Sequence, residues 1–224
     1  GVMTTINRLN IESNVEIVYK TKLIGLKKIK SGYEVTILNP DSSITQFTSK
    51  VVVNSSGLWA NETSKMLGID DRNYELSFWK GEYFWINKKR GFINSLIYPV
   101  PNKNLSGLGI HTTIDVTGRL KVGPDATFIG GSVEEDYHVD MHKKKIFFDF
   151  VKSYIKDIDL DSLEPDYAGI RPKLQKPNES FRDFVISNEE RRGFPNFINL
   201  IGIESPGLTS AFAIAEYVNT LIKI

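Results

Sequence analysis

Two strand–turn–helix units lie far apart in the sequence, and they constrain the fold more than any other feature. The first begins with a short β-branched run, KVVVN at residues 50–54, and continues through Ser55-Ser56-Gly57 into a helical pattern over residues 58–67. The second begins with FINLIGI at residues 197–203 and continues through ESPG into a helical pattern over residues 208–224. The chain is therefore expected to leave a nucleotide-binding-type layer, build a cap and return.

The segments around these units are rich in predicted strands. Apolar and polar residues alternate over residues 15–47, which predicts a small antiparallel meander. Residues 74–124 contain YELSFWKGEYFWI, SLIYPVP, GLGIHTTI and RLKVGP, which predict one large antiparallel sheet. Apolar residues spaced three and four apart over residues 140–155 predict a helix that covers this sheet, with Lys143 to Lys145 on its solvent side. The expected fold class is α/β with an α+β cap.

The composition excludes several function classes. The chain has 28 Lys and Arg against 27 Asp and Glu, with the two signs interspersed, so no cationic face for nucleic acid is expected. It has no Cys, which excludes disulfides and thiolate sites. It lacks an apolar run of about 18 residues, so we expect no membrane span. We expect a cytoplasmic protein, with a peripheral membrane contact left open.

Two side chains are candidates for chemistry on a small anion. Arg171 in AGIRP carries a planar guanidinium that binds a carboxylate bidentately, and the alternative is an ion pair with Asp166, Glu164 or another structural acid. His111 in GIHTT suits a base that takes a hydroxyl proton, and the alternative is a hydrogen-bonded structural histidine. No metal site is expected, because His138 and His142 lack an HExxH pattern and adjoin three lysines.

The predicted cap strands carry further polar candidates. Glu82, Tyr83 and Tyr98 are expected to line the substrate face, and Gly81 permits close approach of a ligand. The alternative for Glu82 is a solvent position at the sheet edge. The aromatic stripe at residues 78, 79 and 83–85 is expected to belong to the core.

Several of these motifs together resemble one group of flavoproteins. The segment VVVNSSGLWANETSKMLGI resembles the second FAD-contacting segment of the D-amino-acid-oxidase-like family. The blocks KGEYFWI, LIYPVPN, GLGIHTTIDVTGRLKVGPDA, YAGIRPKL and ESPGLTSAFAIAEYV resemble the L-2-hydroxyglutarate dehydrogenase/oxidase branch, in the same order. GIRPKL also occurs in relatives that act on amino acids, and glycerol-3-phosphate dehydrogenases share the overall fold.

The resemblance implies FAD as the cofactor and assigns residues to it. Residues 1–72 and 166–224 are expected to form the FAD-binding portion, and residues 73–165 the substrate cap. Backbone N–H groups at the start of the last helix are expected to face the flavin pyrimidine edge. The cofactor contacts implied in this way are Leu23, Ser55, Gly57, Trp59, Gly202, Pro206, Gly207, Leu208 and Thr209.

The resemblance also implies an activity, with alternatives that stay open. His111 is expected to deprotonate a small 2-hydroxy acid such as L-2-hydroxyglutarate while hydride passes to flavin, with Arg171, Glu82 and Tyr98 binding the substrate. The alternatives are glycerol 3-phosphate or an amino acid as substrate. The electron acceptor is O₂, a quinone or an electron-transfer protein.

The sequence departs from the family in one respect. The family's enzymes begin with a GxGxxG turn that holds the FAD pyrophosphate, and no GxG occurs in the first 60 residues here. The chain therefore resembles the C-terminal portion of such an enzyme. On this reading the chain alone is expected to bind FAD weakly or not at all, and a catalytically silent fragment is the remaining alternative.

Overall fold

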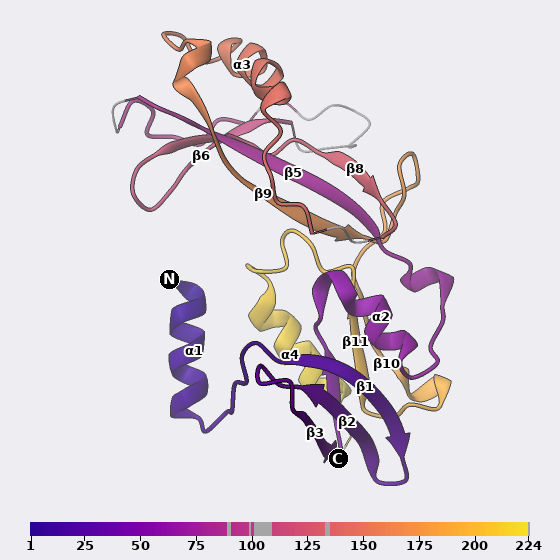
Figure 1. The fold of residues 1–224 in the computed structure, drawn as a ribbon. Coiled ribbons are helices and arrows are strands. Elements are labelled where there is room, and N and C mark those ends of the chain that lie inside the picture. The colour runs from indigo at the N-terminus through magenta and orange to yellow at the C-terminus, as the bar shows by residue number, and fades with distance from the viewer. Residues whose placement is uncertain (89–90, 99, 101–108, 133–134, 224) are drawn as a thin grey trace.

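The computed structural model describes residues 1–88, 91–98, 100, 109–132 and 135–223, and it has two parts (Figure 1). We call residues 1–76 and 174–223 the base and the described residues of 77–173 the cap. The base holds two three-stranded sheets with their helices, and the cap holds a five-stranded sheet with one covering helix. The chain thus enters the cap from the base and returns to it, as the two strand–turn–helix units predict.

The two strand–turn–helix units meet in the base. Strand β4 (Val52–Asn54) pairs in parallel with β11 (Phe197–Ile201), and β10 (Val185–Asn188) pairs with the other edge of β11. Strand β4 leads through a 3-10 turn, η1 (Gly57–Trp59), into α2 (Ala60–Lys65), and β11 leads into α4 (Ala211–Leu221). Because parallel strands point the same way, the two turns that follow them lie at the same edge of this sheet.

The predicted meander forms the second sheet of the base. Strands β1 (Lys22–Ile29), β2 (Gly32–Leu38) and β3 (Ile44–Ser49) pair antiparallel in sequence order. Tyr33 and Leu26 of this sheet pack with Phe197 of β11 in one buried core. The short 3-10 turns of the base are η2 (Arg72–Tyr74) and η5 (Glu189–Arg192).

The cap is built around one long strand. Strand β5 (Ser77–Ile86) pairs along one edge with β7 (Leu120–Gly123) and β8 (Thr127–Gly130), and along the other with β9 (Leu163–Lys173). Strand β6 (His111–Ile114) extends the sheet beyond β7. The sheet thus includes β9 up to Lys173, so it continues beyond the boundary at residue 165 that the sequence suggested. The turns η3 (Met141–Lys143) and η4 (Leu160–Ser162) flank α3 (Lys144–Lys152).

The two faces of β5 have different partners. Phe78 and Phe84 are buried, and Phe84 contacts Phe147 of α3 with ring centroids 4.8 Å apart. The helix therefore covers this face, as its apolar spacing predicts. Trp79 and Tyr83 lie on the opposite face and are only half-buried. The aromatic stripe is thus divided, because side chains alternate between the faces of a strand.

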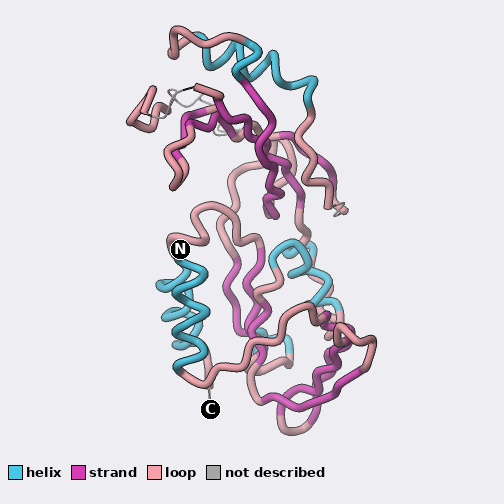
Figure 2. The backbone as a smooth tube through the Cα atoms, turned by 60° about the vertical axis from the view of Figure 1, so that its left-hand side comes forward, coloured by secondary structure: helices cyan, strands magenta, loops and turns pink. Residues whose placement is uncertain are grey.

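Three features differ from the expectation or went unanticipated. Helix α1 (Val2–Glu12) has no buried residue and lies at the periphery of the base in both views (Figures 1 and 2). Residues 95–98 of the expected strand SLIYPVP form no strand, and residues 99 and 101 lie outside the described part. Lys143 turns toward the sheet with 19% of its side chain exposed, whereas a solvent position was expected.

No helix in the described ranges is long and apolar enough to cross a bilayer.

Candidate functional site

A pocket of ≈ 210 Å³ lies on the face of the cap sheet that α3 leaves uncovered. A concave site with a few polar groups among apolar ones is the usual form of a small-molecule site. Its lining comes from β5, from β9 and from the residue after β7, and consists of Gly81, Tyr83, Pro124, Tyr167, Gly169, Ile170 and Arg171. On β9 the residues Tyr167, Gly169 and Arg171 alternate along the strand, so all three belong to one face.

Arg171 joins the pocket to the base. Its Nη1 atom lies 3.4 Å from Oε2 of Glu204, the residue that opens the turn after β11, and 27% of its side chain is exposed. Lys173, two residues further along the same face, lies 3.7 Å from the other oxygen of Glu204. Asp166, an expected structural partner of Arg171, binds Lys121 at 2.6 Å instead. Among the described residues, Arg171 therefore has Glu204 as its acidic partner at long distance, and 27% of its side chain is exposed to an anion.

His111 lies on the same face of the sheet. It is opposite Gly123 in the β6–β7 register, and a Cβ atom at Gly123 would lie 2.8 Å from the ring of Tyr83. Burial and the positive charge of Arg171 lower the pKa of His111 below 6.5, although a hydrogen bond to the Gly109 carbonyl acts in the other direction. Nδ1 lies 3.2 Å from that carbonyl oxygen, so Nδ1 must carry the hydrogen. The neutral ring then leaves Nε2 as a proton acceptor.

Tyrosine rings lie next to His111 and line the pocket together with Arg171. Tyr98 stacks on the His111 ring with centroids 4.3 Å apart, and Tyr83 stacks on Tyr167 at 4.5 Å. Burial and the neighbouring Tyr167 hydroxyl raise the pKa of Tyr83, so this phenol stays neutral. Tyr167 was missed from the sequence, although the alternation YAGIR marks it as a neighbour of Arg171 on one face.

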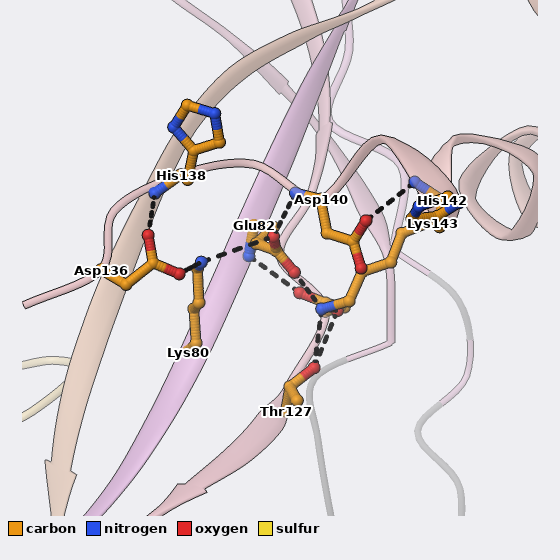
Figure 3. A network of polar contacts seen from close by, with 9 residues as sticks. Lys80, Glu82, Thr127, Asp136, His138, Asp140, His142 and Lys143 are labelled. Carbon is orange, nitrogen blue, oxygen red and sulfur yellow. Dashed lines mark hydrogen bonds and ion pairs between the residues drawn. The ribbon is translucent and has the colours of Figure 1, made fainter. Parts of the chain in front are cut away.

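Glu82 does not lie in the pocket, in contrast to the expectation. Its side chain is 1% exposed on the α3 side of the sheet, where it accepts hydrogen bonds from Lys143 and from the Asp140 backbone N–H (Figure 3). Glu82 follows Gly81, a pocket residue, so strand alternation directs its side chain to the other face. The structure thus gives Glu82 a buried ion pair in place of a contact with substrate.

The first turn of the base is held by a buried amide network. Asn54 accepts hydrogen bonds from the N–H (3.3 Å) and the hydroxyl (2.5 Å) of Ser56, and donates to Asn199 on the adjacent strand at 2.8 Å. Asn199 donates at 2.9 Å to Glu189, whose side chain is buried. These three residues lie behind the Ser55–Gly57 turn and were missed, because only the β4–β11 pairing brings them together.

The predicted cofactor residues around this turn differ in their surroundings. Gly57 adopts φ +59°, and a Cβ atom there would meet nothing within 4 Å. Trp59 is 44% exposed at the start of α2. Leu23 on β1 packs partly against the base core. The turn therefore presents backbone and open space, which suits contact with a large planar or extended ligand.

The second turn, before α4, has a tighter geometry. At Gly207 a Cβ atom would lie 2.5 Å from Cγ2 of Ile203 and 2.7 Å from the Glu204 carbonyl oxygen, so only glycine fits. Gly202 adopts φ +73°, in the region that favours glycine. Within the described ranges, the N–H groups of Leu208 and Thr209 have no acceptor. The two residues lie in the turn ahead of α4, which begins at Ala211 and not at residue 208 as expected, and free backbone N–H groups in a turn can bind negative charge.

The donor set of these turns fits a flavin dinucleotide. A flavin presents a flat ring with carbonyl oxygens that need N–H donors, and the turn at residues 205–209 supplies donors together with a backbone free of a side chain at Gly207. The turn at residues 55–57 offers open backbone at the end of the neighbouring parallel strand. No group of His, Asp or Glu able to hold a metal occurs among the described residues.

Fold and site together define a class of two-part protein: an α/β base whose parallel strands end in turns with free backbone N–H groups, and an antiparallel cap that carries a pocket. Residues 3–221 match the sequence profile of the DAO family, described as FAD dependent oxidoreductases. The chain therefore belongs to the DAO family. The resemblance drawn from the motifs is confirmed by this match.

Individual relatives agree with the family assignment. L-2-hydroxyglutarate dehydrogenase, mitochondrial, of Arabidopsis thaliana is 43% identical over 178 residues, which are 75% of this chain and 36% of that protein. Glycerol 3-phosphate dehydrogenase of Caloramator mitchellensis is 29% identical over 95% of this chain and 41% of its own length. The FAD-bound L-alpha-glycerophosphate oxidase of Mycoplasma pneumoniae superposes with a TM-score of 0.76 at 23% identity, covering 96% of this chain and 53% of that chain. The chain thus spans about a third to a half of the length of these relatives.

Proposed function

We propose that the protein that carries this chain oxidises a small 2-hydroxy acid of the L-2-hydroxyglutarate type to the 2-oxo acid with FAD. The observation that carries the proposal is the placement of neutral His111 and cationic Arg171 on one face of the cap sheet, with Arg171 lining a pocket that borders the cofactor turns. A base and a carboxylate anchor are the two groups that oxidation of a 2-hydroxy acid requires. The 43% identity to an L-2-hydroxyglutarate dehydrogenase supports the substrate class.

The residues of the chain would divide the work as follows. Arg171 binds the substrate carboxylate through its fork and fixes the orientation of the neighbouring C–H bond. His111, neutral because its pKa is lowered by burial, takes the proton of the hydroxyl group at Nε2. Tyr98 covers one face of that imidazole. FAD, when bound, accepts the hydride from the substrate carbon.

The cofactor contacts proposed for the base come mainly from the backbone. The free N–H groups of Leu208 and Thr209, with Pro206, Gly207 and Gly202 shaping the turn, would face the electron-rich edge of the flavin. Ser55, Gly57 and Trp59, together with the backbone near Leu23, would meet the adenosine half. These assignments rest on the motif resemblance, on the open space at Gly57 and on the absence of a side chain at Gly207.

Glycerol 3-phosphate is a second candidate substrate, and one observation favours it. A phosphate dianion needs more positive charge than a carboxylate, and Lys173 lies beside Arg171 on the pocket face of β9. Glu204 partly neutralises this pair, since it contacts both cations. One relative of this chain is named glycerol 3-phosphate dehydrogenase, so glycerol 3-phosphate is included among the substrates to be tested.

Anaerobic reduction of the bound flavin distinguishes the candidates. The purified full-length gene product would be mixed with L-2-hydroxyglutarate, glycerol 3-phosphate or an amino acid, and flavin absorbance followed by stopped flow. We expect rapid reduction by L-2-hydroxyglutarate. Reduction by glycerol 3-phosphate alone would overturn the hydroxy-acid proposal. Reoxidation with O₂, a quinone or an electron-transfer protein would then identify the electron acceptor.

A further inference from the structure

A half-buried ammonium group lies on the face of the cap sheet opposite the pocket. Lys143 in η3 extends its Nζ atom into a group of oxygens on the α3 side of the cap sheet (Figure 3). It donates to the Glu82 carboxylate, to Oδ2 of Asp125 at 2.7 Å and to the hydroxyl of Thr127 at 2.8 Å. The oxygens come from β5, from the β7–β8 connection and from β8, so one side chain joins three segments of the sheet.

Asp125 transmits this contact to the pocket wall. Its other oxygen, Oδ1, accepts a hydrogen bond of 2.8 Å from the Glu82 N–H. A Cβ atom at Gly81 would lie 2.9 Å from Cβ of Pro124 and 3.2 Å from the Asp125 carbonyl oxygen, so the two segments are in direct contact. Gly81 and Pro124 both line the pocket. The position of Asp125 therefore fixes the separation of these two lining residues.

The carboxylates of this group are paired with lysine ammonium groups. The Glu82 side chain is 1% exposed, and a carboxylate removed from water needs a cation and hydrogen bonds to stay ionised. Lys80 is the second cation, 3.9 Å from Glu82 and 2.8 Å from Asp136. Burial acts to lower the pKa of Lys143, but the hydrogen bonds that its ammonium donates to Asp125 and Glu82 raise the pKa above its usual value, so the ammonium stays charged.

We propose that Lys143 is a positioning residue for the pocket: it holds Asp125 and Glu82 together and thereby sets the wall formed by Gly81 and Pro124. Its contacts with Glu82, Asp125 and Thr127 lie on the face opposite the pocket, so it does not touch the substrate. That this wall contacts substrate rests on the proposed function. The contacts of Lys143 with Glu82 and Asp125, the neighbours of the two wall residues, do not rest on it.

The test compares Lys143→Met with Lys145→Met in the full-length gene product. Lys145 lies two residues further along the chain, in α3, and forms an ion pair with Asp149 at 2.7 Å, but 72% of its side chain is exposed. Hydrogen–deuterium exchange would be measured at peptides covering residues 80–86 and 123–127, with β11 as the internal reference. We expect about tenfold faster exchange at the wall in Lys143→Met only, because local opening becomes easier while the base is unchanged.

Steady-state kinetics of the same variants tests whether the wall affects substrate binding. For the substrate that reduces the flavin, we expect Lys143→Met to raise KM about tenfold with flavin content unchanged, since small displacements of positioning groups are costly. A dissociation constant for the product 2-oxo acid, measured from the flavin spectrum, should rise in parallel. The double variant Lys143→Met/Glu82→Gln removes both charges and remains testable where the single variant fails to fold, because loss of a complete buried pair is better tolerated.

Each outcome decides the proposal. Equal wall exchange in Lys143→Met and Lys145→Met, or in the double variant and the parent protein, would overturn it. So would faster wall exchange with unchanged KM, since the wall would then not govern binding. If the parent protein oxidises none of the three substrates, the proposed function fails, and the exchange data alone decide whether Lys143 holds the wall.

Discussion

The base and the cap meet where Arg171, a residue of the pocket lining, contacts Glu204, yet the two parts offer different portions of the chain for binding. In the base, the candidate contacts are backbone groups in turns whose geometry requires glycine, as at Gly207. In the cap, they are side chains on rigid strands, chiefly His111 on β6 and Arg171 on β9. A cofactor of fixed structure can be bound by backbone N–H groups, whereas proton transfer and carboxylate binding need specific side chains.

This difference has a consequence for mutational sensitivity. In the base, an added methyl group at a turn glycine is expected to matter more than the truncation of an exposed side chain. In the cap, the truncation of one polar side chain is expected to matter most. Each of the following predictions either tests this contrast or measures it more finely.

The largest effect is expected at His111. In the full-length gene product, His111→Ala should slow flavin reduction about 100-fold or more, the usual size for removal of a general base. Flavin content should change little, because His111 belongs to the cap. Anaerobic stopped-flow absorbance measures the rate. An unaltered rate would assign His111 a structural role and remove the main support for a side-chain function of the cap.

Arg171 should give the next largest effect. Arg171→Lys keeps the charge and loses the bidentate fork, so KM for the hydroxy acid should rise about tenfold to 100-fold, in line with about 1.5–3 kcal/mol for hydrogen bonds to charged groups. Arg171→Ala should be worse. The thermal midpoint should stay the same in both variants, since the contact with Glu204 is 3.4 Å long and partly exposed. A lowered midpoint with ordinary KM would instead show a structural ion pair.

A pair of glycine substitutions compares the two parts directly. Gly207→Ala should weaken FAD binding about tenfold or more, because the new Cβ atom would meet Ile203 and the Glu204 backbone and so shift the turn. Gly169→Ala should leave FAD affinity unchanged and raise KM, since a Cβ atom there meets nothing within 4 Å of the protein and enters the pocket. Flavin fluorescence titration and steady-state kinetics provide the two readouts. Equal losses of FAD affinity in the two variants would contradict the proposed difference between the base and the cap.

The smallest effect concerns pH. His111 must be neutral to accept a proton, and burial lowers its pKa from 6.5, so the acid limb of kcat/KM should lie below pH 6.5. The unfolded chain binds that proton at higher pH than the folded chain does. The histidine therefore costs stability as pH falls from 6.5 through its folded pKa, and this cost is absent above 6.5. A pH–rate profile of the parent protein measures the limb, and a limb above 6.5 would contradict the environment of His111.

The agreement between sequence and structure differs between elements for a physical reason. The two strand–turn–helix units and the covering helix α3 have strong local periodicity, and each was predicted within a few residues. The meander was also predicted, but its first strand begins at Lys22 and not at Val15. Helix α1 was missed because no turn signal delimits its N-terminal end and none of its residues is buried. The full length of β9 was missed because its pairing with β5 is a long-range contact.

The residues of the candidate site likewise differ in how well the sequence predicted them. Arg171 and His111 were singled out because their chemistry is visible in short motifs, and the structure brings both to one face of the cap. The Glu82 prediction did not follow the alternation of β5, which places that side chain behind the pocket. Lys143 was expected in solvent from helical spacing alone, but it belongs to η3, one residue before α3, where that spacing no longer applies.

By itself, the sequence determined the order of elements, the family and the residue types available for chemistry, because periodicity, turn residues and short motifs are local properties. Only the tertiary structure decided which of those residues share a face and which acids neutralise which cations. Strand pairing joins positions such as Asn54 and Asn199 that are remote in the chain, and packing of the Lys143 turn on the sheet creates the buried ion pair with Glu82. These contacts depend on long-range burial, which no local pattern encodes.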